Sequence, residues 1–223
     1  MTRSFDNTDV NVVTTPGGQR VHKWHAAQSE VLTAGFTEVR KGVWNFVGNG
    51  LSNQSFIQAP EGIIAIDTGE SIEKMREALR RLRELTSEPI AAVIYTHFHY
   101  VEGTKAIFQE GNHVSPLPIY AHEKVKGNKA RTLGEISPAY ARGLVEQFAI
   151  VMPLEGPDAT VNVGLGYFYK NPAHVPYTPG YVDATHLLGA RDSLTIAGLK
   201  VEAVHSPSDS DDSVNFYFPE IGT

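Results

Sequence analysis

Two histidines stand one residue apart in the segment "VIYTHFHYVEGTKA", residues 93–106, directly after an apolar run. Residues i and i+2 of a strand point to the same side, so the side chains of His97 and His99 can reach one metal ion together. Zinc binds imidazole nitrogens at ~2.0–2.1 Å. Two histidines do not complete a metal site, so a further ligand must come from another loop at the same edge of the sheet.

The segment "HSPSDSDDS", residues 205–213, is the obvious source of that ligand, because it also follows a predicted strand and is dense in oxygen atoms. Two histidines with one carboxylate suit a zinc ion that keeps one position open for water. The same set suits non-haem iron(II). His205 is an alternative third ligand. A hydrogen-bonded histidine pair without a metal is the alternative for the whole motif.

Hydrophobic spacing predicts the elements that must position these side chains. Apolar residues recur at three- and four-residue steps through residues 71–87, which indicates a helix, and Ser71 can cap its start. Buried strands are predicted on either side, one ending before Asp67 and one over residues 90–95. Together they predict a βαβ unit in an α/β protein. Ligands of open α/β sheets lie at the carboxyl ends of such strands.

The rest of the chain predicts three further features. A helix is expected from Ser137, with this serine as its cap. Residues 153–181 hold several prolines and glycines and are expected to form a long ordered loop. A hairpin is expected to turn at Ala197 and Gly198.

Bulk composition limits the function. The chain has 223 residues, a formal net charge of −6 and no cysteine. It shows no dense basic block, which argues against nucleic acid as a partner. It has no long apolar run and no signal-like start, so we expect no membrane span and a cytoplasmic location. Residues 1–30 are polar and are expected to be an extended arm, and residues 31–223 are expected to form one domain.

Three segments in this order, "IIAIDTG", "AAVIYTHFH" and "VHSPSDSDDSV", resemble the landmarks of the metallo-β-lactamase superfamily. The segments "GLSNQSFI", "PAYARGLVEQF" and "VNFYFPE" are similar to those of its linear (type III) alkyl sulfatases. The resemblance implies an αββα sandwich, with metal at the sheet edge. It also implies a hydrolase in which metal-bound water attacks a sulfate or other ester of an apolar molecule.

Carried over residue by residue, the resemblance makes His97 and His99 the first two metal ligands. It places Asp209 where the sulfatases have a glutamate ligand, and Asp67 where the superfamily has a buried carboxylate supporting the metal loop. The family's next aspartate and histidine are Val101 and Glu102 here.

The two departures predict a one-zinc centre, with iron as the other candidate metal and a second site that is weak or absent. Glu102 is then the candidate general base or a weak second-site ligand, and Tyr100 the candidate donor to a substrate oxyanion.

The chain ends at Thr223, soon after the last predicted strand, whereas the family's pattern continues. We therefore expect a sandwich that is incomplete on its C-terminal side, completed by a missing segment or by homo-oligomerisation. Two other functions remain open. One is a non-catalytic relative that keeps the fold for binding or assembly, and the other is a mononuclear iron oxygenase.

Overall fold

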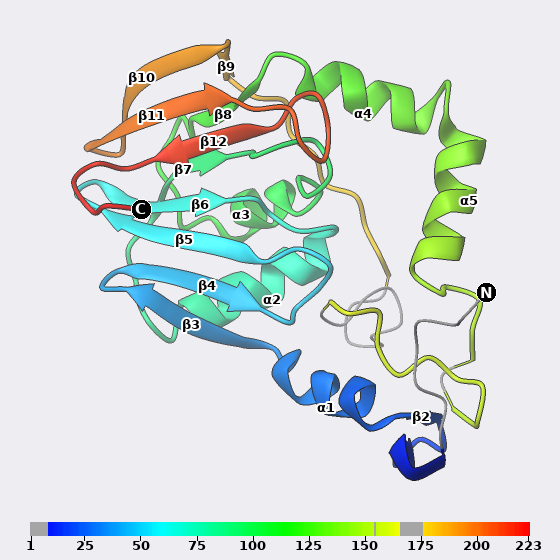
Figure 1. Cartoon of the computed structure of the whole chain (residues 1–223). Helices are drawn as coiled ribbons and strands as arrows, with labels where there is room; N and C mark the ends of the chain where they lie inside the picture. The colour runs from blue at the N-terminus through cyan, green and yellow to red at the C-terminus, as the bar shows by residue number, and fades with distance from the viewer. Residues whose placement is uncertain (1–8, 154, 166–175) are drawn as a thin grey trace.

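The computed structural model describes residues 9–153, 155–165 and 176–223 (Figure 1). Within them, a seven-stranded sheet has the order β3-β4-β5-β6-β7-β8-β9, and a three-stranded sheet has the order β10-β11-β12. The strands of the larger sheet are β3 (Gly35–Arg40), β4 (Val43–Val47), β5 (Gln54–Ala59), β6 (Gly62–Ile66), β7 (Ile90–Ile94), β8 (Ile119–His122) and β9 (His186–Leu188). Those of the smaller sheet are β10 (Arg191–Ile196), β11 (Leu199–His205) and β12 (Val214–Tyr217).

The two sheets and the helices α2 (Ile72–Leu82) and α3 (Thr104–Glu110) form three layers. One face of the larger sheet packs on the two helices, and the other face packs on the three-stranded sheet. Strands β6, β7 and β8 pair in parallel, which confirms the predicted βαβ unit. The predicted α/β architecture is confirmed. In the described part, alternate residues of β10 and β11 point outward into solvent.

Helix α2 begins where the sequence predicts, because the Ser71 hydroxyl accepts a hydrogen bond from the backbone N–H of Lys74 at 3.2 Å. Its apolar stripe is buried against the sheet. The helix ends at Leu82, five residues earlier than predicted. The following N–H groups of Glu84 and Leu85 bond three residues back, which tightens the chain into turns. Pro89 then disfavours helical continuation in the residue before it.

The hairpin between β10 and β11 turns at Ala197 and Gly198, as predicted. Both residues have positive φ, 50° and 85°. Two consecutive positive φ values are what a two-residue hairpin of matching twist requires. The predicted loop over residues 153–181 contains no helix or strand in its described residues.

The expectation of an extended arm over residues 1–30 is wrong for the described part. It contains a 3₁₀ turn η1 (Asp9–Asn11), a hairpin of β1 (Val12–Thr14) and β2 (Arg20–His22), and helix α1 (Lys23–Val31). No residue of α1 is buried, so the helix leaves no apolar periodicity in the sequence. Asn162 holds it instead, by donating to the His25 carbonyl at 3.1 Å and to the Ser29 hydroxyl at 2.8 Å.

Two helices flank the end of the sheet where β7 and β8 finish (Figure 1). Helix α4 (Val125–Leu133) was not predicted, because it buries only Val125 and Thr132 and shows no apolar stripe. Helix α5 (Ser137–Gln147) was predicted, but its N-cap is Ile136 rather than Ser137. Within the described ranges, the longest apolar stretch of any helix falls short of what a bilayer crossing needs.

Candidate metal centre

His97, His99 and Asp209 converge at the carboxyl edge of the larger sheet. The two histidines lie in the loop after β7, and Asp209 lies in the connection from β11 to β12. One carboxylate oxygen, Asp209 Oδ2, lies 3.2 Å from His97 Nε2 and 2.9 Å from His99 Nδ1. Among the described residues, this trio is the group of histidine and carboxylate side chains able to hold a metal ion, with its ligand atoms all within 4.8 Å of one another.

The trio has the chemistry of a metal site. His97 Nε2 and His99 Nδ1 are buried and have no hydrogen-bond partner among the described residues, although Asp209 Oδ2 is close to both. A buried polar atom without a partner is costly, and a shared cation would satisfy both nitrogens. Ligand atoms around a tetrahedral zinc lie about 3.3 Å apart, given metal–ligand distances of ~2.0–2.2 Å. The separations of 3.2 and 2.9 Å from Asp209 Oδ2 to the two imidazole nitrogens are close to that spacing, so the residues fit a divalent cation.

Thr96 fixes the ring of His97. The Thr96 hydroxyl donates to Asp67 Oδ2 at 2.6 Å and lies 2.8 Å from His97 Nδ1. Since that hydroxyl proton goes to the carboxylate, Nδ1 carries the hydrogen and donates to Thr96 Oγ1. In the neutral ring Nε2 is then the unprotonated nitrogen, and it faces Asp209. The partner of the second ring nitrogen is therefore Thr96, with Asp67 one step behind it.

Asp67, which accepts the hydrogen bond from the Thr96 hydroxyl, has a strained backbone conformation. Its φ is +54°, which is uncommon for a residue with a side chain. Burial raises the pKa of its carboxyl to about 6, against the hydrogen bonds from Thr96 and the charge of His97. Its Oδ1 accepts from the Thr96 N–H at 2.9 Å. The carboxylate is thus directed at Thr96 by two bonds.

His99 is held in the neutral form that a metal ligand requires. Burial lowers its pKa below the usual histidine value, and the neighbouring His97 adds to this lowering, whereas Asp209 opposes it. The rings of the two histidines are 5.1 Å apart at 74°. A neutral ring leaves a nitrogen lone pair free for a cation, which favours metal binding by His99 near neutral pH.

Two tyrosines border the histidines. The ring of Tyr100 lies 5.2 Å from that of His97, and burial, helped by the charges of Glu70 and Asp209, raises its pKa to about 12. Tyr140, on α5, stacks on His99 with centroids 6.3 Å apart at 9°. Its pKa is raised by burial and by Asp209. Both phenols keep their protons at neutral pH. The sequence predicted Tyr100, whereas nothing in the local pattern around Tyr140 pointed to the site.

Glu102 is not part of the cluster. Its Oε1 pairs with the Lys129 ammonium, and its Oε2 accepts from the Tyr181 N–H at 3.0 Å. Both oxygens are thereby engaged by α4 and by the segment before β9, which leaves the predicted base or second-ligand role without a contact to the histidines. Val101 is fully buried in the core formed with α2 and α3. The described part of the chain therefore offers one cluster of ligands.

His205, the alternative third ligand, lies elsewhere. Its Nε2 lies 2.7 Å from the carbonyl oxygen of Asp211, and its ring stacks on His122 with centroids 4.0 Å apart. The stack packs the start of the β11–β12 connection against the end of β8. His205 thus supports the loop that carries Asp209 rather than joining the cluster.

Two buried groups of opposite charge, Glu70 and Lys74, lie near Tyr100. Glu70 Oε1 accepts from the Ser52 N–H at 2.7 Å, and Lys74 Nζ donates to the Asn49 carbonyl at 2.7 Å. Lys74 is fully buried. Burial lowers its pKa to about 8, and Glu70 opposes this lowering. The pair connects the loop between β4 and β5 to the start of α2.

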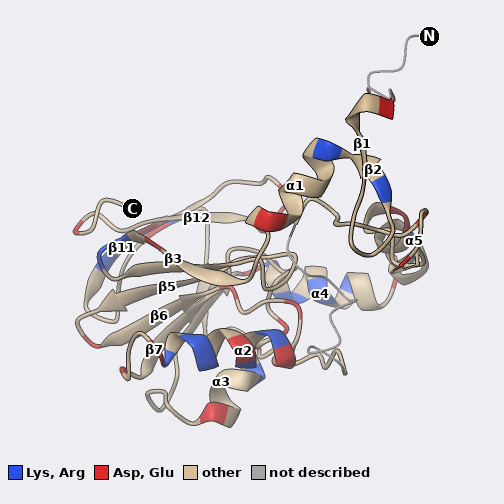
Figure 2. Ribbon diagram, turned by 90° about the horizontal axis from the view of Figure 1, so that it is seen from below, with Lys and Arg blue, Asp and Glu red and all other residues tan. Residues whose placement is uncertain are grey.

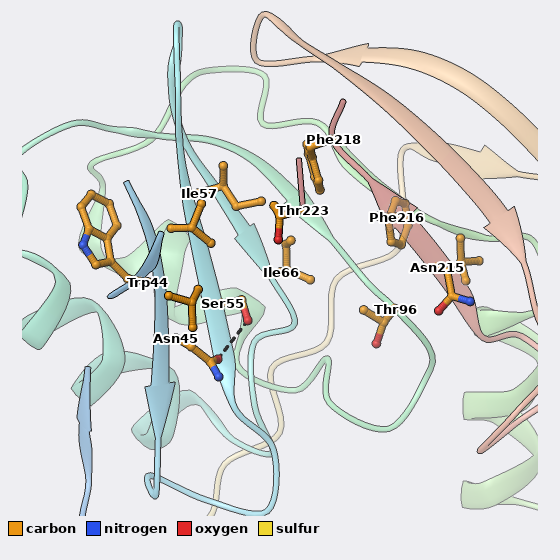
Figure 3. A pocket seen from close by; sticks show the side chains of 13 residues that line it. Trp44, Asn45, Ser55, Ile57, Ile66, Thr96, Asn215, Phe216, Phe218 and Thr223 are labelled. Atoms are coloured by element: carbon orange, nitrogen blue, oxygen red, sulfur yellow. Dashed lines mark hydrogen bonds between the residues drawn. The ribbon is translucent and has the colours of Figure 1, made fainter. Parts of the chain in front are cut away.

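A groove of about 310 Å³ opens between the two sheets behind Thr96 (Figure 3). Trp44, Ile57 and Phe216 give it apolar walls. The lining contains Thr96 but none of the three clustered side chains. The groove and the cluster therefore have no side chain in common, and we do not assign the groove to the substrate of the cluster.

A family profile described as the metallo-beta-lactamase superfamily matches residues 47–100, which run from the end of β4 through the two histidines. The layered fold and the cluster at the sheet edge agree with this match to the metallo-β-lactamase superfamily.

Within that class, the chain is similar to alkylsulfatases. It is 34% identical to the linear primary-alkylsulfatase of Pseudomonas sp. (strain ATCC 19151) over 169 residues, 74% of this chain and 30% of that protein. It is 26% identical to an (R)-specific secondary-alkylsulfatase of Pseudomonas sp. over 210 residues, 88% of this chain and 30% of that protein. A solved structure of a double mutant of the sec-alkyl sulfatase PisA1 superposes with a TM-score of 0.75 at 24% identity, covering 90% of this chain and 32% of that one. The chain thus spans about a third of the length of these relatives.

Proposed function

We propose that the chain is a metal-dependent hydrolase of the alkylsulfatase kind, with one zinc ion held by His97, His99 and Asp209. The observation that carries the proposal is the convergence of two unpartnered, buried imidazole nitrogens on one carboxylate oxygen. The similarity to a primary- and a secondary-alkylsulfatase supports a sulfate ester of an apolar alcohol as the substrate class. A zinc ion here would act as a Lewis acid and would supply a water-derived nucleophile near pH 7.

The chain's own residues have separate roles in this proposal. Thr96 and Asp67 keep the proton of His97 on Nδ1, so Nε2 stays available. Tyr100 and Tyr140 border the histidines as protonated phenols and are placed to donate hydrogen bonds to oxygen atoms of a bound ester. The side chain of Asp209 is 62% exposed, which leaves the outer side of the cluster open to a substrate.

Metal analysis followed by a sulfate-release assay tests the proposal. Protein purified without chelator is expected to carry about one zinc per chain and to release sulfate from a medium-chain alkyl sulfate. Asp209→Ala is expected to lose both. His186→Ala is a matched control, because His186 stacks on Tyr120 away from the cluster. Zinc content without sulfate release would remove the substrate assignment and keep the metal site. One iron per chain would replace the hydrolase by an oxygenase.

A non-catalytic relative is the second candidate function. The engagement of Glu102 by Lys129 and Tyr181 favours it, because the residue predicted as a base is directed away from the cluster. Absence of any bound metal from wild-type protein equilibrated with excess Zn²⁺ would establish this candidate in place of the hydrolase.

A further inference from the structure

Three lysines at the start and middle of α4 each pair with an acid from a different segment of the chain. Lys124 Nζ lies 3.1 Å from Asp211 Oδ2, and Lys126 Nζ lies 2.6 Å from an oxygen of Asp183. Lys129 pairs with Glu102. The sequence alone presents these lysines as a solvated charge run, and Figure 2 shows the Lys and Arg positions of the helix as blue segments. The three pairs instead connect α4 to three other segments of the chain.

The pair of Lys129 and Glu102 connects α4 to the loop that carries the histidines. Lys129 and Glu102 are largely buried, with side chains 13% and 16% exposed. The Glu102 backbone is also fixed, since its N–H donates to the Gly69 carbonyl at 3.0 Å. Glu102 comes three residues after His99. Helix α4 therefore holds the C-terminal end of the histidine loop.

Contacts of Lys124 and Asn128 with Asp211 connect α4 to the loop that carries Asp209. Asn128 donates from Nδ2 to Asp211 Oδ1 at 2.7 Å, while Lys124 contacts the other carboxylate oxygen. The carbonyl of Asp211 is held by His205 at 2.7 Å. Asp211 comes two residues after Asp209. Asp209 thus lies on a loop in which Asp211 is held through both carboxylate oxygens and its carbonyl oxygen.

We propose that α4 is a positioning element for the metal centre, with Lys129 and Asn128 setting the separation of the two ligand loops. The inference rests on the proposed metal site. His97 and His99 are more than a hundred residues from Asp209 in the chain, so their spacing depends on what ties the two loops to a common support. A ligand set functions only when its atoms are held within a few tenths of an ångström. Residues that orient metal ligands from behind commonly contribute ~10–100-fold in metal affinity.

The third ion pair of α4 supplies a matched control. Lys126 pairs with Asp183, which lies in the segment before β9 and carries no ligand of the cluster. Lys126→Met removes a lysine of the same helix, two residues from Lys124 and three from Lys129. It should leave the metal affinity unchanged within about twofold, since neither ligand loop loses a tie.

Titration of the metal-free 223-residue chain with Co²⁺, followed by its visible absorption, tests the proposal. Lys129→Met and Asn128→Ala are each expected to weaken Co²⁺ binding by ~10-fold or more. They should also change the intensity of the visible bands, because the ligand geometry relaxes. Lys129→Arg keeps the ion pair with Glu102 and should restore both quantities. Thermal unfolding of each metal-free variant verifies that the fold persists.

The outcomes separate this inference from the function on which it rests. Wild-type protein that binds no Co²⁺ would overturn the metal site itself. Wild-type protein that binds one ion, with unchanged affinity and spectrum in Lys129→Met and Asn128→Ala, would overturn only the positioning role of α4. A loss in Lys126→Met as large as in Lys129→Met would also overturn it, since the effect would then belong to the helix in general.

Discussion

Replacing Thr96 by valine removes one hydroxyl that serves two neighbours. This hydroxyl donates to Asp67 Oδ2 at 2.6 Å and accepts from His97 Nδ1 at 2.8 Å. The valine side chain has a similar shape, and the backbone bonds of residue 96, to Asp67 Oδ1 and from the Val214 N–H, remain available. The substitution therefore isolates the hydroxyl.

Two magnitudes follow from the geometry. Asp67 is 8% exposed, so its carboxylate oxygen Oδ2 loses the hydrogen bond that the Thr96 hydroxyl donates and gains none from water. That loss costs about 1.5–3 kcal/mol of unfolding free energy in the metal-free protein. His97 loses the acceptor that keeps its proton on Nδ1, and both tautomers become populated. Metal affinity should then fall by ~10-fold or more, equivalent to about 1.4 kcal/mol.

Urea unfolding of the metal-free protein and Co²⁺ titration measure the two effects separately. Thr96→Ser is the control, because it keeps the hydroxyl and removes only the methyl group. We expect Thr96→Ser to bind Co²⁺ nearly as wild type does. Equal Co²⁺ affinities for Thr96→Val and wild type would refute the assignment of Thr96 as the group that orients His97.

Three further predictions concern stability. Burial lowers the Lys74 pKa from 10.5 to about 8, while the unfolded chain keeps its proton up to the higher value, so the unfolding free energy should rise between pH 8 and 10.5 by about 3 kcal/mol at most. Urea unfolding across that range measures the rise, which Lys74→Met should abolish; a rise that persists in the variant would contradict the assignment. Gly103→Ala should destabilise by several kcal/mol, because its Cβ would meet the Thr68 carbonyl oxygen at 1.8 Å, and a thermal midpoint equal to wild type would show that this approach relaxes freely. Tyr95→Phe should cost about 1–3 kcal/mol in urea unfolding, since the buried Thr104 hydroxyl, 2.7 Å from the phenol oxygen, loses a partner; a cost below ~0.5 kcal/mol would indicate that Thr104 is satisfied by its other contacts.

Local patterns predicted the part of the site that lies within one segment. His97 and His99 follow a strand whose five residues are all buried, and both the strand and the i, i+2 spacing can be read from the sequence. Asp209 was placed by its match to a family motif, and the structure brings it to the histidines.

What could not be predicted depends on tertiary partners that leave no periodic signal. Glu102 was expected near the metal. The sequence around an acid beside two histidines does not distinguish a metal ligand from a partner of a distant lysine. That lysine, Lys129, is 27 residues away on a helix that buries almost nothing. Helix α1 was missed for the same reason, because Asn162 rather than an apolar stripe holds it.

The cluster draws its ligands from both layers of the sandwich. His97 and His99 lie in a loop that follows a strand of the larger sheet, whereas Asp209 lies in the connection between two strands of the smaller one. A cation bound there would link the two sheets at one edge, in addition to the apolar contacts between them. Chelation would then weaken the contact between the two sheets without disturbing the pairing within either sheet. The smaller sheet would therefore exchange its amide hydrogens faster than it does in the metal-bound protein.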